Sequence, residues 1–536
     1  MEHTVLGARQ TRRGGSRELL GFLFCLVSAA AILMICSLNS VLYPLNRWED
    51  VNCFVTVARG MLNGLLPYRD LAEQKGPLLY ALHALALWPN PASYHGLYVV
   101  EVLAVAPFLY LCWRTIRLYD DKLSVLWMAP LAAFLCAGYC FRLGDSAEEL
   151  CLPFAMASMY AYLRSLRRGE PISSRGYVAH GALAGCVFWI KYSQLGIHFM
   201  FMAMQAVLAV WDDSRKAGRL KLGRAIQMCL FFLLGMLLSS VPWLVWFGAN
   251  GAIPDMLRVY IYENIFGYVS RKYPVIVQIG AGMVRGMLEN RAMTAAMLLG
   301  LVLVLTAPKD RMSWREKGFL VLAAASTAVM VYGGGRRYAY YYFAFAPFVG
   351  FALMAVGPIR SWISGRFSGR GRAVKPGLAW KRALAAALCA AVLALSTGYA
   401  HRHSVNARYI GLPWSQTPQG RFGAYIRESE DRTLLSLHLM DSGFYMAADV
   451  QPVNYYFCLL NNYEDRAMAD QMAVVEAQRV RFLVTGAGET LEDVVRIVRE
   501  SWPDLLDEDF EPRYHLAMEA GGYKLYERDA EGEASA

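Results

Sequence analysis

Apolar stretches long enough to cross the roughly 30 Å hydrocarbon core of a membrane recur along this chain, from 18–42 to 383–399. Lipid tolerates such stretches as helices, because a helix pairs its own backbone polar groups. Apolar residues make up 56% of the sequence, which exceeds the roughly 45–50% of soluble domains. We therefore expect a mainly α, polytopic helical membrane protein with about eleven spans.

The charged loops between the apolar stretches predict an orientation. Arginines precede the first stretch, and short cytoplasmic loops carry an excess of Lys and Arg, so we expect the N-terminus inside. Four later loops rich in these residues fall on the same side: 164–175, 215–224, 309–317 and 360–382. The formal charge of +10 is therefore a topology signal, and we expect membrane lipids and no nucleic acid as partners.

Three regions follow from this orientation. Residues 1–18 are expected to form a cytoplasmic tail, and 19–400 a transmembrane domain whose first external loop is 43–93. Residues 401–536 would form an extracytoplasmic domain, because the last span carries the chain outside.

The last region has the pattern of a small α/β domain. Strand-like runs alternate with segments of helical periodicity. The strand-like runs are 433–439, 481–485 and 523–526, and the helical segments are 467–479 and 491–502.

Acidic residues of the first outer loop lie at the membrane boundary. Asp50 follows the first span and precedes apolar residues at helical spacing in 51–62. It either stabilises the N-terminus of an interfacial helix or acts as a catalytic acid where a lipid headgroup meets an aqueous acceptor. Glu49 and Arg69 belong either to a solvated collar or to a substrate site.

A second acidic group, Asp145 with Glu148 and Glu149, lies on another turn of the same predicted side. Asp145 with Glu148 three residues later fits a helix cap. Alternatively, two acidic sites on one membrane face hold a divalent cation, through Asp50 and Asp145, or divide the general-base and acceptor-orienting roles. This cation is the one cofactor we consider.

Several cations fit phosphate binding. Lys75 precedes Pro77 at the start of an expected interfacial helix, and helix N-termini and lysine both favour phosphate. Arg336 and Arg337, next to a tyrosine-rich helix start, either hold a phosphate or anchor at the headgroups. Lys191 lies inside an apolar stretch, where an ionisable residue either snorkels or serves function.

The order of these segments resembles one family. The segments are Asp50 after the first span, 67–70 with 75–77, the turn 144–149, 185–192 with its lysine, and Tyr341-Tyr342-Phe343 before Pro347. Together they look like the bacterial GT-C glycosyltransferases, which include mannosyltransferase-like and lipid A aminoarabinose transferase-like proteins. The resemblance covers about residues 19–400.

The resemblance implies inverting transfer of a sugar from a polyprenyl-phosphate donor to a glycan, lipid or protein acceptor at the outer face of a bacterial cell membrane. Asp50 would act on the acceptor hydroxyl, with Asp145 and Glu148 orienting the acceptor or a metal. The residues expected to bind the donor phosphate are Lys75, Arg336 and Arg337. Further candidates for substrate binding are Glu49, Tyr68, Arg69, Glu149, Lys191 and Tyr341.

Two other classes share many spans and charged outer loops: a transporter or flippase of lipid-linked saccharides, and a non-catalytic envelope assembly protein. The charges cluster in two outer loops rather than at mid-membrane, and no matching pair of broken helices is evident in the sequence. Both features favour an enzyme over a transporter.

Overall fold

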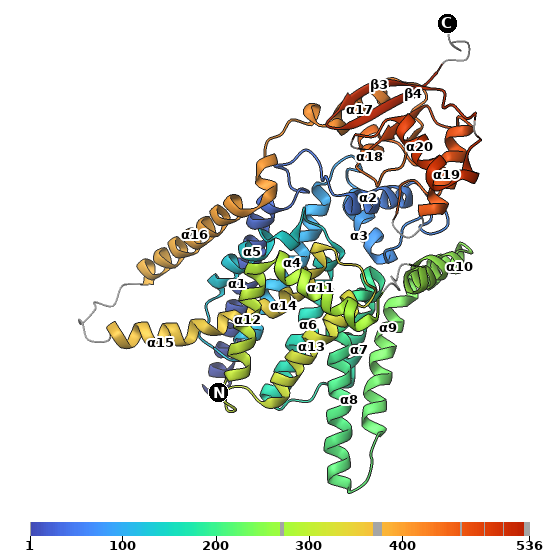
Figure 1. Cartoon of the computed structure of the whole chain (residues 1–536). Helices are drawn as coiled ribbons and strands as arrows, with labels where there is room; N and C mark the ends of the chain where they lie inside the picture. Colours follow the sequence, from blue (N-terminus) through green and yellow to red (C-terminus); the bar gives the residue numbers. More distant parts are fainter. Residues whose placement is uncertain are drawn as a thin grey trace. The chain divides into compact units, whose positions relative to one another are not determined.

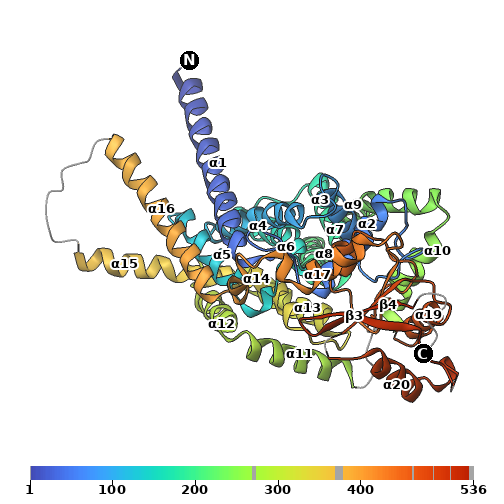
Figure 2. The same ribbon diagram turned by 90° about the horizontal axis from the view of Figure 1, so that it is seen from above.

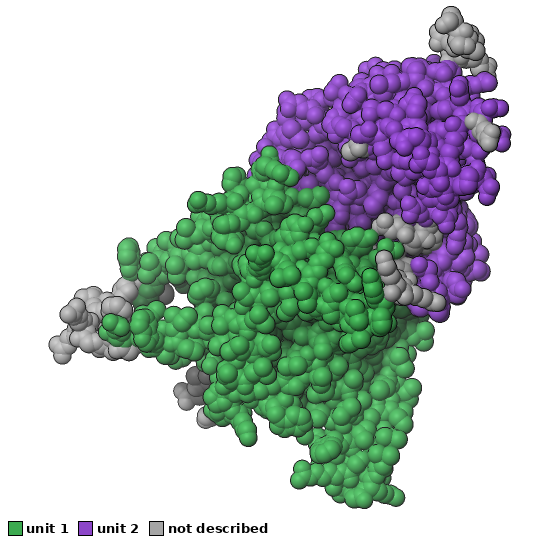
Figure 3. Space-filling model, in the orientation of Figure 1, with its two compact units in different colours: residues 1–37, 100–241, 270–408 green, residues 38–99, 242–269, 409–536 purple. Residues whose placement is uncertain are grey.

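The computed structural model describes residues 2–267, 273–367, 378–460, 464–486, 488–507 and 509–529. The chain forms two compact units, each assembled from three segments (Figures 1 and 3). Unit 1 comprises 1–37, 100–241 and 270–408, and unit 2 comprises 38–99, 242–269 and 409–536. The predicted boundary at residue 400 concerns placement relative to a membrane and stays a prediction. Part of the predicted basic loop, 368–377, lies outside the described residues.

Unit 1 is built from helices. The α-helices that lie in it wholly or mostly are α1 (Glu2–Cys36), α4 (His95–Ile116), α5 (Met128–Cys136), α6 (Ala147–Arg168), α7 (Ser174–Lys191), α8 (Gly196–Ala217), α9 (Gly223–Ala249), α11 (Val275–Glu289), α12 (Arg291–Thr306), α13 (Trp314–Tyr332), α14 (Ala346–Val349), α15 (Val356–Phe367) and α16 (Leu378–His403). Short 3₁₀ segments are η1 (Val125–Trp127), η2 (Tyr139–Phe141), η3 (Tyr192–Gln194), η5 (Ala339–Phe345), η6 (Gly350–Ala355) and η7 (Val405–Tyr409).

Five described helical segments are long and apolar enough to cross a membrane: Gly15–Cys36, His95–Ile116, Gly223–Ala249, Ala339–Ser364 and Ala379–His403. The number rises to seven if the bent pairs α7 with α8 (118°) and α11 with α12 (109°) each count as one span. The chain is therefore a membrane protein. Helices α1 and α16 lie at the first and last predicted apolar stretches, 18–42 and 383–399, while the count of about eleven spans and the orientation stay predictions.

Close helix approach within unit 1 depends on glycine. A Cβ atom on Gly181 of α7 would lie 1.9 Å from the backbone oxygen of Phe232, and one on Gly235 of α9 would lie 2.0 Å from that of Val178. In lipid, where helix association relies on tight packing, small residues let two backbones approach each other. The observed contact between α7 and α9 therefore requires glycine at both positions.

Unit 2 combines helices with a sheet. Its helical elements are α2 (Glu49–Leu62), α3 (Pro77–Leu87), α10 (Ile253–Met256), the π-helix η4 (Leu257–Gly267), η8 (Trp414–Gln416), α17 (Pro418–Glu428), α18 (Phe444–Ala448), α19 (Glu464–Glu476), α20 (Leu491–Ser501) and η9 (Pro503–Leu505). Its strands are β1 (Leu434–Ser436), β2 (Phe482–Thr485), β3 (Tyr514–Ala520) and β4 (Tyr523–Arg528).

The four strands form one sheet in the order β1-β2-β4-β3. β1 and β2 run parallel, and β4 pairs antiparallel with both β2 and β3, beside which it lies in Figures 1 and 2. Gly521 and Gly522, both at positive φ, make the tight turn between β3 and β4. The predicted strand-like runs form β1, β2 and β4. The sequence did not predict β3, because its residues YHLAMEA include several that favour helices.

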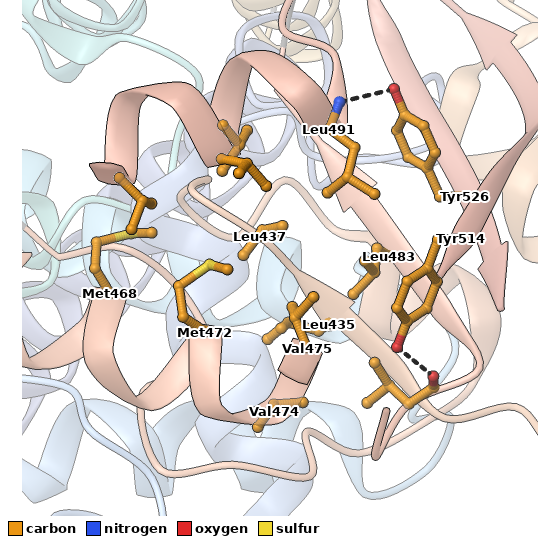
Figure 4. Close-up of a cluster of buried hydrophobic side chains, with 14 of the residues drawn as sticks. Leu435, Leu437, Met468, Met472, Val474, Val475, Leu483, Leu491, Tyr514 and Tyr526 are labelled. Carbon is orange, nitrogen blue, oxygen red and sulfur yellow. Dashed lines mark hydrogen bonds between the residues drawn. The ribbon is translucent and has the colours of Figure 1, made fainter. Parts of the chain in front are cut away.

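Apolar side chains fill one face of this sheet (Figure 4). Leu435 of β1 and Leu483 of β2 are register partners and pack against Met472 of α19 within this cluster. Phe482, one residue earlier, faces the other side, because side chains alternate along a strand. Its ring lies 6.1 Å from that of Tyr425 in α17. The sheet is therefore covered by helices on both faces.

Candidate functional site

The predicted site residues divide between the two units. Unit 2 holds Glu49, Asp50, Tyr68, Arg69 and Lys75, and unit 1 holds Asp145, Glu148, Glu149, Lys191, Arg336, Arg337 and Tyr341. Among the described residues, no group of three His, Cys, Asp or Glu side chains is arranged to hold a metal ion. The predicted cation at Asp50 and Asp145 stays a prediction.

Asp50 lies in the first turn of α2, next to Glu49, and both are half-buried. The helix runs over Glu49–Leu62 and so confirms the one predicted from the spacing of 51–62. Acidic side chains in a first turn interact favourably with the N-terminal N–H groups of the helix. The position of Asp50 is compatible with both of its predicted roles.

Two polar contacts tie α2 to the C-terminal segment of unit 2. Thr56 Oγ1 donates to Asp441 Oδ2 at 2.5 Å, and Arg59 Nη2 donates to Asp449 Oδ1 at 2.5 Å. Asp441 is fully buried, and only 4% of Arg59 is exposed. Bonds to buried charged groups are costly to break. The contacts of Thr56 and Arg59 therefore fix the rotation of α2 about its axis, and with it the position of Asp50.

Asp441 makes the stability of the protein pH-dependent. Burial raises the pKa of this carboxyl to about 6, against the lowering effects of Thr56 and the Gly443 N–H. The folded protein therefore keeps the Asp441 proton to higher pH than the unfolded chain. The free energy of unfolding should fall by about 2 to 3 kcal/mol as pH rises from about 4 to about 6. Unfolding in detergent across this range measures the slope.

The Asp441→Asn variant should lose this slope, because an amide does not titrate. Its oxygen can still accept from the Gly443 N–H, and its NH₂ group can donate to Thr56 Oγ1, so both contacts remain. Asp504→Asn, at an exposed position, is the matched control and should retain the slope. An identical pH dependence in wild type and Asp441→Asn would contradict the assignment.

A pair of cysteines in unit 2 offers a further check on the placement of α2. The Sγ atoms of Cys53 in α2 and Cys458 lie 3.5 Å apart, and both residues are buried. A disulfide needs about 2.05 Å between sulfur atoms, so a small movement suffices. A mild thiol oxidant, taking two electrons and two protons from the pair, should link them. Non-reducing peptide mass spectrometry should detect the link, which Cys458→Ser should remove. A link from Cys53 to another cysteine would contradict this packing.

Lys75 is held in a mostly buried setting at the start of α3. Its side chain is 12% exposed, and its Nζ lies 3.6 Å from Glu73 Oε1 and 5.3 Å from the centre of the Phe54 ring. The backbone N–H of Lys75 donates to Glu73 Oε2 at 2.8 Å, and the Tyr80 hydroxyl donates to the same oxygen. This arrangement fixes a cation next to a helix N-terminus, and phosphate binding by Lys75 stays a prediction.

Tyr68 and Arg69 have different surroundings although they are adjacent. Tyr68, at φ 71°, is fully buried, stacks with Tyr260 at 6.4 Å between ring centres, and donates its hydroxyl to the Lys75 carbonyl at 2.6 Å. The Arg69 side chain is 44% exposed and pairs with Asp70 at 3.0 Å. Tyr68 thus supports the Lys75 backbone, and substrate contacts of both residues stay predictions.

In unit 1 the helix cap before α6 differs from the predicted one. Ser146 is the N-cap, and its Oγ accepts a hydrogen bond from Glu149 N at 3.0 Å. Glu149 Oε2 accepts from Asp145 N at 3.0 Å. The prediction of a cap by Asp145 with Glu148 was wrong. An N-cap residue has extended backbone, as Ser146 does, whereas Asp145 is left-handed at φ 66°. The hydrogen bonds of the cap therefore involve Glu149 and not the Glu148 side chain.

Three predicted residues meet beside this cap. Lys191 Nζ lies 2.5 Å from Glu148 Oε1 and 4.2 Å from the centre of the Tyr341 ring. The ion pair is buried, with 9% of the Lys191 side chain and none of the Glu148 side chain exposed. Lys191 ends α7 and Glu148 lies in the first turn of α6, so each charge complements the dipole of its own helix. The sequence identified these residues singly and did not predict their pairing.

Glu101 of α4 is an acid that sequence reasoning missed. It is fully buried, and the Ser37 hydroxyl donates to its Oε2 at 2.6 Å. A Cβ atom on Gly144, which has φ 92°, would lie 2.6 Å from Glu101 Oε1. The turn before α6 thus approaches this carboxylate only because residue 144 lacks a side chain. An acid inside an apolar stretch was the signal available in the sequence.

Arg336 and Arg337 follow α13 and line a pocket of about 540 Å³ within unit 1. Two further arginines, Arg142 and Arg285, line the same pocket and were missed. In the sequence each is a single charge near the end of an apolar stretch, where an arginine commonly anchors at the headgroups.

No protein-family model and no curated protein sequence matches this chain. Two crystal structures of ArnT from Cupriavidus metallidurans resemble it. The structure bound to undecaprenyl phosphate has a TM-score of 0.55 and 13% identity, covering 95% of this chain and 97% of that chain. The apo structure has a TM-score of 0.54 and 12% identity, covering 94% and 97%.

This chain has the ArnT fold. These two structures confirm, for the fold, the resemblance predicted from the sequence. The likeness to ArnT covers nearly the whole chain and therefore extends past the predicted limit of residues 19–400.

Proposed function

We propose that this protein is a membrane glycosyltransferase, which moves a sugar from a polyprenyl-phosphate donor to a glycan, lipid or protein acceptor at the outer face of a bacterial cell membrane. The ArnT fold carries this proposal, because ArnT has been crystallised bound to undecaprenyl phosphate and the fold likeness spans 95% of this chain. The mostly buried cation at Lys75 supports a phosphorylated donor.

In the proposed reaction Asp50 takes the proton of an acceptor hydroxyl, as a positioned carboxylate does in general-base catalysis. The acceptor oxygen forms a bond to the anomeric carbon of the sugar, on the face opposite the phosphate. The bond from that carbon to the phosphate oxygen breaks, and polyprenyl phosphate leaves with the bonding electrons. One displacement of this kind inverts the anomeric configuration.

The cation of Lys75 stabilises the charge that develops on the departing phosphate. Its low exposure matters, because an electrostatic interaction is stronger in a site shielded from water. The bonds from Tyr68 and Glu73 to the Lys75 backbone hold this cation in place before the donor arrives.

Asp145 and Glu148 are proposed to orient the acceptor. The Lys191 ammonium stabilises the charge of Glu148, and Tyr341 closes over the ammonium. Glu149 has a supporting role, because its carboxylate holds the backbone of Asp145.

Comparative mass spectrometry of lipid-linked and surface glycans tests the function as a whole. A strain without this protein should lack one sugar on a surface glycan and should accumulate the corresponding polyprenyl-phosphate sugar. A flippase would instead leave a complete lipid-linked saccharide unused inside the cell. Unchanged glycans and unchanged donor levels would contradict the proposal.

Replacing Lys75 should weaken donor binding. Lys75→Ala removes a charge-assisted contact, so the affinity of the purified protein for a polyprenyl phosphate should fall about tenfold or more. Calorimetry in detergent measures the change, and Lys309→Ala, at an exposed lysine, is the matched control. Equal affinity in Lys75→Ala and wild type would remove Lys75 from the phosphate site.

A further inference from the structure

A groove of about 650 Å³ lies along α1 in unit 1. Its walls come from α1, from Trp113 of α4, from the segment 122–125 before α5, and from α16. α1, α5 and α16 contact one another and lie together in Figures 1 and 2. The lining contains Arg17, Lys122 and Ser124, and its other described residues are apolar side chains and one glycine. The groove is therefore apolar and carries two cations.

Trp113 fixes the shape of the groove. Its indole N–H donates to the Leu123 carbonyl at 3.1 Å, which anchors the segment that carries Lys122. A Cβ atom on Gly21 would lie 2.6 Å from the Trp113 ring. The ring therefore reaches α1 only because residue 21 lacks a side chain, and this contact sets the distance between α1 and α4.

The α1 wall of the groove has the length of one membrane leaflet. Leu20, Leu23 and Val27 recur there at helical spacing, and all three are exposed. From Arg17 to Val27 the helix rises about 15 Å, because an α-helix advances about 1.5 Å per residue. This length is half of the roughly 30 Å hydrocarbon core. The wall therefore fits one acyl chain that runs from the headgroup region toward the bilayer centre.

Both cations of the groove lie toward the N-terminal end of α1. Arg17 is one turn before Gly21 in α1, and Lys122 follows the C-terminal end of α4. These two helix ends are joined by Arg114 of α4, whose Nη1 lies 2.8 Å from Glu18 Oε2 of α1. Lysine and arginine at a membrane surface attract anionic lipid headgroups. A headgroup at this end of the groove therefore meets two cations.

The acids near this end pair with other cations. Glu18 pairs with the arginine of α4, and Asp120 Oδ1 lies 2.9 Å from Arg360 Nη2. No acid is among the described residues that line the groove. Within the described part of the chain, neither Arg17 nor Lys122 forms an ion pair. One end of the groove is therefore positively charged, which complements a phosphate group.

We propose that this groove binds an anionic phospholipid, with its phosphate at Arg17 and Lys122 and one acyl chain along the exposed apolar residues of α1. In the predicted orientation this lipid belongs to the cytoplasmic leaflet. Little of α16 is buried within the protein, so a lipid seated against both α1 and α16 adds contacts that hold α16 in place. The inference involves none of the residues of the proposed sugar transfer and does not rest on that function.

Native mass spectrometry of the delipidated full-length protein in detergent measures the dissociation constant of the first phosphatidylglycerol that binds. The wild type should bind it about tenfold more tightly than phosphatidylcholine with the same acyl chains. Arg17→Gln/Lys122→Gln should lose this preference and raise the phosphatidylglycerol constant about tenfold. Arg219→Gln/Lys221→Gln is the matched control, because it removes two exposed cations between α8 and α9 on the same predicted membrane side, and it should bind like wild type.

A second pair of variants tests the acyl-chain part of the groove. Ala390→Trp fills the groove from α16 and leaves both cations, so phosphatidylglycerol binding should weaken about tenfold. Ala394→Trp, one turn later on α16 at an exposed position outside the lining, is the control and should bind like wild type. Thermal unfolding without lipid verifies each variant. Added phosphatidylglycerol should raise the unfolding temperature of wild type and of Ala394→Trp, but not of Ala390→Trp.

Three results would overturn the proposal. Equal losses in the two glutamine pairs would show that basic loops attract anionic lipid in general, without a site in this groove. Wild-type binding by Arg17→Gln/Lys122→Gln would remove the headgroup contact, and this variant decides the outcome if Ala390→Trp does not fold. Displacement of phosphatidylglycerol by an equal concentration of farnesyl phosphate would assign the groove to a polyprenyl chain instead of a phospholipid.

Discussion

Asp50→Asn should reduce sugar transfer by at least about 100-fold while the protein stays folded, because removal of a general base typically costs 10²- to 10⁴-fold. The amide is nearly isosteric with the carboxylate but cannot take the proton of the acceptor hydroxyl. The loss should appear in the turnover rate rather than in donor affinity. Transfer from a labelled polyprenyl-phosphate sugar by purified protein measures both quantities.

The alternative role of Asp50 predicts a different result. An acid that only stabilises the N-terminus of α2 contributes about 0.3 to 1 kcal/mol to stability, and its amide would retain full transfer. The bonds from Thr56 and Arg59 hold α2 independently of Asp50, so the variant should remain assembled. Glu430→Gln, at an exposed acid of unit 2, controls for the loss of one charge. Wild-type turnover in Asp50→Asn would exclude the catalytic role.

The apolar stretches predicted the positions of helices, because a helix in lipid needs a long run of apolar residues and such a run is visible in the sequence. Amphipathic helices were harder to find. In α11 the polar residues Gln278, Arg285 and Glu289 interrupt the apolar ones, so no continuous apolar stretch marks this helix in the sequence. These three polar residues line the pocket of unit 1 that contains Arg336 and Arg337. The residues that break the apolar pattern of α11 are therefore the ones that face this pocket.

The sequence allowed single candidate residues to be named, but it did not predict which of them contact one another. Glu148 and Lys191 each stood out as charges near apolar stretches, but they are 43 positions apart and only the packing of α6 against α7 pairs them. The cap register depended on which residue adopts a left-handed backbone, and both Asp145 and Ser146 are good N-cap residues. Long-range pairing and local backbone handedness are set by tertiary structure, which one sequence does not display.

Lys191→Met should be the most destabilising of the substitutions considered. It leaves the Glu148 carboxylate buried without its cation, and breaking a buried ion pair in this way costs about 3 to 5 kcal/mol. Thermal unfolding in detergent should show the loss, while Lys216→Met, at an exposed lysine of α8, should unfold like wild type. A small shift in Lys191→Met would indicate that water or another group already solvates Glu148.

The double variant Glu148→Gln/Lys191→Met separates structural from functional contributions. Neutralising both partners removes the uncompensated charge, so its stability should exceed that of Lys191→Met alone. If the pair serves folding only, the double variant should also recover sugar transfer. If Glu148 orients the acceptor, stability should return and transfer should not, with the loss in apparent acceptor affinity as well as in turnover. If the stability loss of the double variant equalled the sum of the losses in Glu148→Gln and Lys191→Met, the two side chains would not be coupled. The 2.5 Å contact between Lys191 Nζ and Glu148 Oε1 argues against that result.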